Sequence, residues 1–282
     1  MRVDEWHLTE DVDGFLTGAG DFLHSRPALH TLLLTVTEVL RARGASAKGA
    51  DAPVFGRLEE AGDVSAAFFR TPPRRLNLTE LTVDQADALA GRLSHLGHRL
   101  PGVTAVHHTA VAFAEAWGRH TGAVPVLGQR RRLYRLGTLT PPEPAPEGRS
   151  RVAGGQDQER LAEWNDDFAA AIGDADATRS AGKHAGYRRF TFWETPDGTP
   201  VSMAAVTPMV AGQVRVGSVY TPAELRGRGY ASAVTTEVSR AALAGGAAEV
   251  VLFTDLANPT SNAVYQRIGY RPVADFASFD FA

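Results

Sequence analysis

The pattern of apolar and polar residues is easiest to interpret in the second half of the chain. Apolar residues recur at steps of three and four over residues 157–172, which predicts a helix with one apolar face. Residues 188–194 alternate and are rich in aromatic and β-branched side chains, which predicts a strand. Residues 249–254 are almost all apolar, as in a strand buried on both faces. The pattern as a whole predicts helices at 157–172, 229–244 and 259–268, and strands at 188–194, 201–210, 213–220, 249–254 and from 270 onward.

The first half of the chain repeats this order of elements. Its pattern predicts a hairpin at 54–60 and 64–70, strands at 75–81, 103–107 and 124–136, and helices at 83–96 and 110–120. The order hairpin, strand, helix, strand, helix, strand therefore occurs twice, although the identity between the two halves is low. Two copies of one α/β (α+β) unit, each a mixed central sheet flanked by helices, are the simplest interpretation.

A proline-rich segment separates the two halves. Residues 140–150 contain four prolines and a glycine. Because proline fixes φ and removes a backbone donor, we expect this segment to be extended and to stay out of a sheet interior. The expected organisation is therefore a domain at 1–140, a linker at 141–150 and a second domain at 151–282.

Composition narrows the class of protein. Of the 282 residues, 44% are apolar and 22% charged, which is typical of globular domains and excludes global disorder. The formal net charge of −3 lacks the basic excess of a general nucleic-acid binder. There is no cysteine, which excludes disulfides, thiolate metal sites and a cysteine nucleophile. No apolar run approaches a membrane span, and Asp4 and Glu5 stand where a signal peptide would be basic, so we expect a cytoplasmic protein with neither nucleic acid nor membrane as partner.

A turn with two glycines carries the strongest candidate chemistry. Residues 221–231 follow an expected strand, and within them Gly227 and Gly229 precede a helix. Glycine lets the backbone turn tightly and leaves the amides of the loop and first helical turn free for a pyrophosphate. A tight turn with solvated Arg226 and Arg228 explains the same residues. The chain has no Gly-Lys-Ser/Thr and no third glycine in dinucleotide-binding register, so neither of those phosphate motifs fits.

The same turn matches a short family signature. That signature is Arg/Gln-x-x-Gly-x-Gly/Ala after a strand, and Arg226, Gly229 and Ala231 match it. Alone, it is only moderately specific, so a second signature is needed.

The second signature lies after the buried strand. It consists of an Asn, a Tyr seven residues later, and Gly-Phe/Tyr four residues after that, matched by Asn258, Tyr265, Gly269 and Tyr270. On both signatures the chain resembles the Gcn5-related N-acetyltransferase (GNAT) superfamily over residues 149–282. The duplicated order resembles the bacterial tandem type, in which the N-terminal GNAT-like half is degenerate.

The resemblance implies a fold, a co-substrate and a set of site residues. It implies two GNAT-like units with the C-terminal unit active, and acetyl-CoA as co-substrate without a metal. In the family, the strand before the loop contributes backbone to the pantetheine arm, the loop amides hold the pyrophosphate, and the Asn bonds the pantetheine. Carried over to this chain, the cofactor-binding residues are Ser218, Val219, Tyr220, Arg226, Gly227, Arg228, Gly229, Tyr230, Ala231 and Asn258. Tyr265 is the expected catalytic residue, which protonates the departing thiolate.

The implied function is an acyl-CoA-dependent N-acyltransferase. It would transfer acetyl from acetyl-CoA to a primary amine by direct attack, since no Ser or Cys nucleophile is indicated. The acceptor is a small-molecule or peptide amine, and the protein is a monomer or a homodimer. The alternative is a non-catalytic CoA-binding sensor or assembly module.

Structural explanations also exist for the two candidate residues after the buried strand. Asn258 before Pro259 would cap a helix. Tyr265 would pack as a core aromatic with Val264 and Ile268 on one helix face. These alternatives are compatible with ligand contact, since one side chain can serve both purposes.

No general base can be named from the sequence. Phe253 stands where some family members have a Glu on the buried strand. Asp255, Glu194 and His184 are candidates, and a water relay would also serve. For each of the three, a surface or loop charge is the better explanation.

The first half lacks both signatures. Residues 82–87 contain no glycine, and Asp84 and Asp87 would repel a pyrophosphate at the helix start. The counterpart of the tyrosine falls at 114–117, which offers no usable proton donor. We therefore expect this half to have lost cofactor binding.

Three histidines of the first half, His107, His108 and His120, invite a zinc interpretation. They have no carboxylate at ligand spacing, so no metal site is expected.

Overall fold

A computed structural model describes residues 5–43, 52–172 and 187–282. The chain divides into two compact units, and each is described by itself. Unit 1 comprises Met1–Arg132 and Ala274–Ala282, and unit 2 comprises Leu133–Val273.

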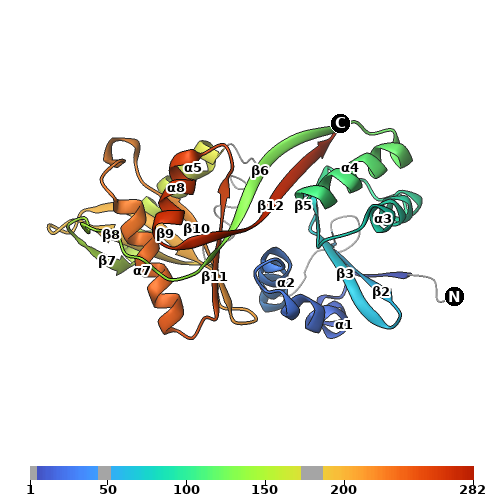
Figure 1. The fold of residues 1–282 in the computed structure, drawn as a ribbon, viewed down its shortest axis with the longest axis horizontal. Helices are drawn as coiled ribbons and strands as arrows, with labels where there is room; N and C mark the ends of the chain where they lie inside the picture. Colours follow the sequence, from blue (N-terminus) through green and yellow to red (C-terminus); the bar gives the residue numbers. More distant parts are fainter. Residues whose placement is uncertain (1–4, 44–51, 173–186) are drawn as a thin grey trace. The chain divides into compact units, whose positions relative to one another are not determined.

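Unit 1 is a sheet with helices packed against it (Figure 1). Its elements are β1 (Glu5–Thr9), α1 (Val12–Ser25), α2 (Thr31–Arg43), β2 (Val54–Glu60), β3 (Asp63–Arg70), β4 (Leu76–Leu78), α3 (Val83–His95), β5 (Gly102–Val106) and α4 (His107–Thr121). The strand order is β1-β2-β3-β4-β5, with β4 and β5 parallel and the other pairs antiparallel. Apolar residues of α3 and α4, such as Leu89 and Phe113, form a buried core with strand residues such as Phe68.

Two long strands belong to both units. They are β6 (Pro125–Leu136) and β12 (Tyr270–Phe281), and each crosses the boundary between the units inside its own length. The C-terminal part of β12 pairs antiparallel with β5, from Phe276 opposite Val106 to Asp280 opposite Gly102. The chain's last residues therefore complete the sheet of unit 1.

These bounds differ from the expected domains at 1–140 and 151–282. Unit 1 ends earlier along the chain and recruits 274–282, because β5 takes its antiparallel neighbour from the chain's C-terminus. The proline-rich segment lies within unit 2, where the Trp193 indole N–H donates to the Glu147 carbonyl at 3.1 Å. Its last two residues begin an edge strand rather than a linker.

Unit 2 is a sheet with apolar clusters on both faces. Its further elements are β7 (Arg149–Val152), η2 (Gly155–Asp157), α5 (Gln158–Ile172), β8 (Arg189–Glu194), β9 (Pro200–Val206), β10 (Gln213–Tyr220), η4 (Ala223–Leu225), α7 (Tyr230–Ala244), β11 (Glu249–Asp255) and α8 (Pro259–Arg267). The strand order is β11-β10-β9-β8-β7, with β10 and β11 parallel and the others antiparallel. One cluster joins Val214 and Val216 of β10 to α7 and α8, and the other joins Trp164 of α5 to Phe192 of β8.

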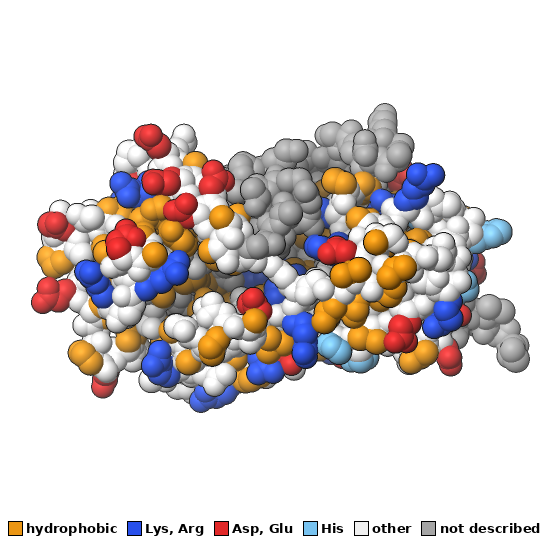
Figure 2. Space-filling model, turned by 90° about the horizontal axis from the view of Figure 1, so that it is seen from above, with side chains coloured by type: hydrophobic (Ala, Val, Ile, Leu, Met, Phe, Trp, Pro, Cys, Tyr) orange, Lys and Arg blue, Asp and Glu red, His pale blue; other side chains and the backbone are white. Residues whose placement is uncertain are grey.

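The predicted elements are all present, with shifted ends. The largest shift of an end is at 201–210, where β9 ends four residues early at Val206, and only three residues of 75–81 form β4. The sequence pattern had not predicted β1, α1, α2 or β7. In the part of the chain that the structure describes, no helix is long and apolar enough to cross a bilayer. Figure 2 shows basic and acidic side chains interspersed on the visible face, in keeping with the small net charge.

Candidate functional site

The parallel strands β10 and β11 separate toward their carboxyl ends. Their register runs from Gln213 opposite Glu249 to Val216 opposite Leu252, yet β10 continues to Tyr220. On the other edge of β10, the register with β9 shifts after Gly217, and Ser218 has a φ of 47°. A non-glycine residue in the left-handed region marks a local distortion of the strand, here a bulge. An opening between two strands thus begins at Ser218 and Val219.

The loop after β10 is held by its own arginines. The Arg226 Nε–H donates to the Thr221 carbonyl at 3.1 Å, and the Arg228 guanidinium donates to the Glu224 carbonyl at 3.2 Å. Both side chains were expected to be solvated in the purely structural interpretation. They are exposed, but each also folds back onto the loop and fixes its shape.

The start of α7 leaves backbone donors unused. Gly227 and Gly229 have φ of 77° and 80°, and Gly229 is the N-cap without a side-chain hydrogen bond. Within the described ranges, the amides of residues 229–232 have no hydrogen-bond partner. The loop is exposed, and its only near neighbour at Gly229 is the Pro146 ring, 3.7 Å from where a Cβ would stand. An uncapped helix N-terminus facing solvent is suited to bind an anion.

Asn258 has the capping role and a free donor. Its Oδ1 accepts the Ser261 N–H at 2.9 Å at the start of α8, with Pro259 at the first helical position. Its Nδ2 donates to no described residue, and the side chain is exposed. Capping therefore leaves the amide group available to a ligand.

Tyr265 is buried and its hydroxyl is unengaged. The side chain is 8% exposed, and its ring meets Tyr270 edge-on with centroids 6.1 Å apart. The Tyr270 hydroxyl is bonded to Ser239 Oγ at 2.7 Å, whereas the Tyr265 hydroxyl has no partner among the residues described. Burial raises the pKa of Tyr265, so its phenol stays protonated at neutral pH and can donate.

Two of the candidate bases are committed to other contacts. Glu194 accepts from the Arg151 Nε–H at 2.6 Å, and Asp255 accepts the Ala257 N–H at 2.8 Å. His184 lies outside the described residues. The Tyr220 hydroxyl donates to Asp167 at 2.9 Å, and burial followed by this contact raises the Tyr220 pKa.

Sequence reasoning missed a cation at the bulge. The Arg188 guanidinium donates to Ser218 Oγ at 3.2 Å, although thirty residues separate them in the chain. Only the pairing of β8, β9 and β10 brings the two together, and a motif search cannot reveal such a contact.

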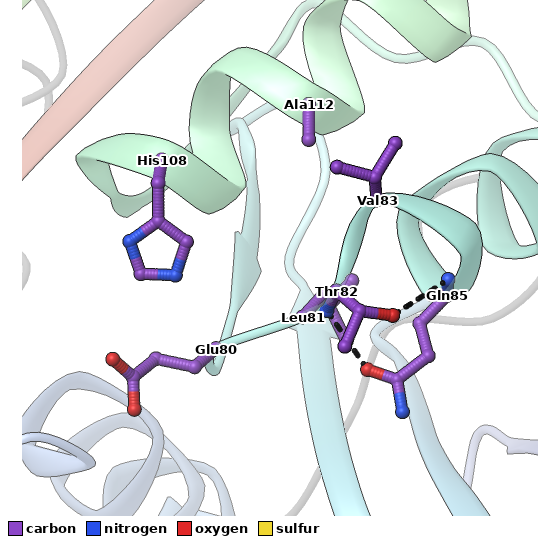
Figure 3. A pocket seen from close by; sticks show the side chains of 7 residues that line it. All are labelled: Glu80, Leu81, Thr82, Val83, Gln85, His108 and Ala112. Carbon is purple, nitrogen blue, oxygen red and sulfur yellow. Dashed lines mark hydrogen bonds between the residues drawn. The ribbon is translucent and has the colours of Figure 1, made fainter.

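The corresponding helix of unit 1 begins differently. A pocket of about 400 Å³ lies between the starts of α3 and α4, lined by residues that include Val83, His108 and Ala112 (Figure 3). At the start of α3, Thr82 Oγ1 accepts the Gln85 N–H and Gln85 Oε1 accepts the Thr82 N–H, as the dashed lines in Figure 3 mark. Side chains thus occupy donors that α7 leaves free.

The three histidines of unit 1 do not converge on one point. His120 lies 3.3 Å from Asp87, which Arg119 also contacts. Among the described residues, no group of three His, Asp or Glu side chains is placed to hold a metal ion.

Comparison with known proteins identifies a domain and a fold. The model of the acetyltransferase (GNAT) family matches residues 156–270. Among curated proteins, no sequence matches this chain. Among solved structures, a GCN5-related N-acetyltransferase from Kribbella flavida is 19% identical with a TM-score of 0.53, covering 76% of this chain and 86% of its own.

Two further structures match nearly end to end. A GNAT-family acetyltransferase from Colwellia psychrerythraea is 12% identical with a TM-score of 0.60, covering 99% of this chain and 100% of its own. A tandem GNAT protein from the clavulanic acid biosynthesis pathway is 16% identical with a TM-score of 0.58, covering 99% and 98%. At these identities the likeness concerns the fold, which is that of two GNAT-like units.

Proposed function

Because the acetyltransferase (GNAT) family model matches residues 156–270 and the fold is that of two GNAT-like units, we propose that the protein transfers an acetyl group from acetyl-CoA to a primary amine. Membership of this domain family supports an acyl-CoA-dependent N-acetyltransferase in general. The observation that carries the specific proposal is the uncapped N-terminus of α7 beside the opening between β10 and β11.

The proposed cofactor contacts follow the path from the helix start to the opening. The amides of Gly229, Tyr230 and Ala231 bind the pyrophosphate, while the side chains of Arg226 and Arg228 keep the loop in shape. The backbone of residues 218–220 binds the pantetheine arm beyond the point where β11 stops pairing with β10. The free Nδ2 of Asn258 donates to an amide oxygen of that arm.

The proposed chemistry is direct attack. The amine nitrogen forms a bond to the thioester carbonyl carbon, the carbon–sulfur bond breaks, and the amine loses its proton to water. Tyr265, whose hydroxyl has no partner among the described residues and stays protonated because it is buried, gives its proton to the departing thiolate, and the phenolate then takes back a proton from water. The acetyl group never becomes attached to the protein.

The alternative is a CoA-binding module that performs no chemistry. No particular feature of unit 2 favours it, but unit 1 shows that a GNAT-like unit can keep its fold with a capped helix start.

The test measures binding and chemistry separately. Calorimetric titration with CoA should show saturable binding, and thiol release from acetyl-CoA should rise with one class of amine in a panel of amino acids, polyamines, aminoglycosides and peptides. Binding without amine-dependent thiol release across the panel would favour the sensor. No binding at millimolar CoA would refute both.

A further inference from the structure

Among the described residues of unit 2, Arg188 is a cation without a counter-ion. It immediately precedes β8, and its one hydrogen bond is to Ser218 Oγ at 3.2 Å. None of the carboxylates in the described residues pairs with it. Burial lowers the pKa of its guanidinium, and no charged neighbour in the described ranges offsets this effect. An arginine nevertheless stays protonated, so a desolvated positive charge stands beside the bulge.

Another arginine of the same unit has a guanidinium whose N–H groups are paired with carboxylates. Arg151 donates to Glu194 at 2.6 Å and to both oxygens of Asp157 at 2.7 and 2.9 Å. Among the described residues, Arg188 uses one of its five N–H donors. A partly desolvated cation is costly unless an anion joins it, which indicates a ligand.

The position of Arg188 indicates whether the anionic group belongs to the amine acceptor or to CoA. Gly217, which Arg188 approaches, lies opposite Ala205 in the sheet. Ala205 packs in one cluster with Phe192 of β8 and Trp164 of α5. The Arg188 Nη1 is 3.6 Å from where a Cβ of Gly217 would stand. The helix α7 packs on the opposite face, against Val214 and Val216. A ligand that reaches Arg188 thus approaches from the face opposite α7, whose first turn is the proposed pyrophosphate site.

We propose that Arg188 binds a carboxylate of the acceptor, which makes the acceptor class an amine that carries a nearby carboxylate, such as an amino acid. This inference rests on the proposed acetyl transfer. Two N–H groups of the guanidinium donate to the two oxygens of the carboxylate. The hydrogen bond to Ser218 Oγ holds the guanidinium in the orientation that this contact needs. Arg188 is a specificity-determining residue and takes no part in proton transfer.

The test compares amino acids with the corresponding amino-acid amides as acceptors. With the wild-type protein, kcat/KM should favour the carboxylate form, and Arg188→Gln should lower kcat/KM for that form about 10- to 100-fold, chiefly through KM. Values for the amides should not change. For Arg188→Lys, kcat/KM with the carboxylate form should lie between the values of the wild-type protein and Arg188→Gln, because lysine keeps the charge but lacks the paired N–H donors of a guanidinium.

A matched control separates loss of the proposed carboxylate contact from loss of one positive charge at this place in the chain. Arg189 is the next residue, is exposed and has no charged partner among the described residues, so Arg189→Gln should leave both acceptor series unchanged. Arg188→Gln should not lower the melting temperature, since it breaks no ion pair. A large loss of stability would assign Arg188 a structural role and overturn the proposal.

Binding can be tested without turnover. In the presence of CoA, an N-acetyl amino acid should stabilise the wild-type protein against heat more than its amide does, and Arg188→Gln should remove the difference. Equal stabilisation by both would refute the carboxylate site. If CoA still binds in that experiment, the proposed acetyl transfer is not refuted. Failure of the carboxylate site can therefore be distinguished from failure of the proposed function.

A dicarboxylic acyl donor is the other source of a carboxylate. Succinyl-CoA and acetyl-CoA are compared with one neutral amine. A preference for succinyl-CoA that Arg188→Gln abolishes would keep the carboxylate site and overturn its assignment to the acceptor.

Discussion

The helices α3 and α7 occupy the same place in their units and begin in opposite ways. Each follows one strand of a parallel pair and leads to the other. Thr82 and Gln85 close the start of α3 with reciprocal hydrogen bonds, whereas Gly229 leaves the first amides of α7 without partners. A helix start costs free energy unless its donors are satisfied, either by side chains or by a ligand. The same topology therefore supplies a closed helix start in one unit, whereas in the other it leaves donors for the pyrophosphate that we propose to bind there.

The helices after the second parallel strand differ in the same way. α8 carries Tyr265, whose hydroxyl has no partner in the described part of the chain. On α4, Phe113 and Trp117 stack at 13° within the apolar core. Side chains that fill a core leave no proton donor. In unit 1, both the start of α3 and the inner face of α4 therefore contribute to stability and packing.

The largest effect is expected from Tyr265→Phe. It removes the proton donor and keeps the ring, so turnover of acetyl-CoA should fall about 100-fold or more, with the dissociation constant of CoA nearly unchanged. Tyr270→Phe is the matched control, because its hydroxyl bonds Ser239. The control should lose about 1 kcal/mol of stability and keep turnover. Full activity of Tyr265→Phe would exclude its catalytic role.

Gly229→Asp is the second most severe change, because it gives α7 the kind of cap that α3 has. The carboxylate would occupy the free amides and repel a pyrophosphate, so CoA affinity measured by calorimetry should fall about 100-fold. Gly198→Asp places the same side chain at another positive-φ glycine in a turn of unit 2, and should leave affinity unchanged. Equal affinities for the two variants would show that this helix start does not bind the cofactor.

Acid should affect the two units in different pH ranges. In unit 1, burial lowers the pKa of His30 to about 4, so the unfolded state binds its proton first and stability falls from pH about 6.5 to 4, by about 3 kcal/mol. In unit 2, the Arg151 hydrogen bonds lower the pKa of Asp157 to about 2, so its contribution of about 2 kcal/mol is lost between pH about 4 and 2.

Hydrogen exchange resolved by segment would measure this difference. At pH 5, amides of α2 should lose protection while those of β8 keep it. His30→Leu should remove the loss in unit 1, and substitution of the exposed His24 should not. Loss of protection in β8 before α2 would contradict the assignment.

The smallest effect concerns the cap of α3. Thr82→Ala removes the bond to the Gln85 amide and should lower the free energy of unfolding by about 1 kcal/mol, measured with denaturant. Thr17→Ala in α1, whose hydroxyl bonds the Asp13 carbonyl within a helix, should cost less. CoA affinity should not change, and a change would place the cofactor in unit 1.

Much of the site could be predicted because its signals are local. The positive φ of Gly227 and Gly229 and the cap by Asn258 each involve residues a few positions apart, and the chain shows them directly. Helices α1 and α2 were missed, although α1 has a side-chain cap at Asp11 and an apolar face that includes Phe15.

The sequence by itself determined the order of the elements, the glycine turn and the spacing of Asn258 and Tyr265, because periodicity and backbone preference act over a few residues. Only the tertiary structure decided that the end of β12 completes the sheet of unit 1, that Arg151 pairs with Glu194, and that Arg188 stands at Ser218. Each of these depends on which strands are neighbours and in what register. Register results from packing across the whole sheet, so a short stretch of sequence cannot specify it.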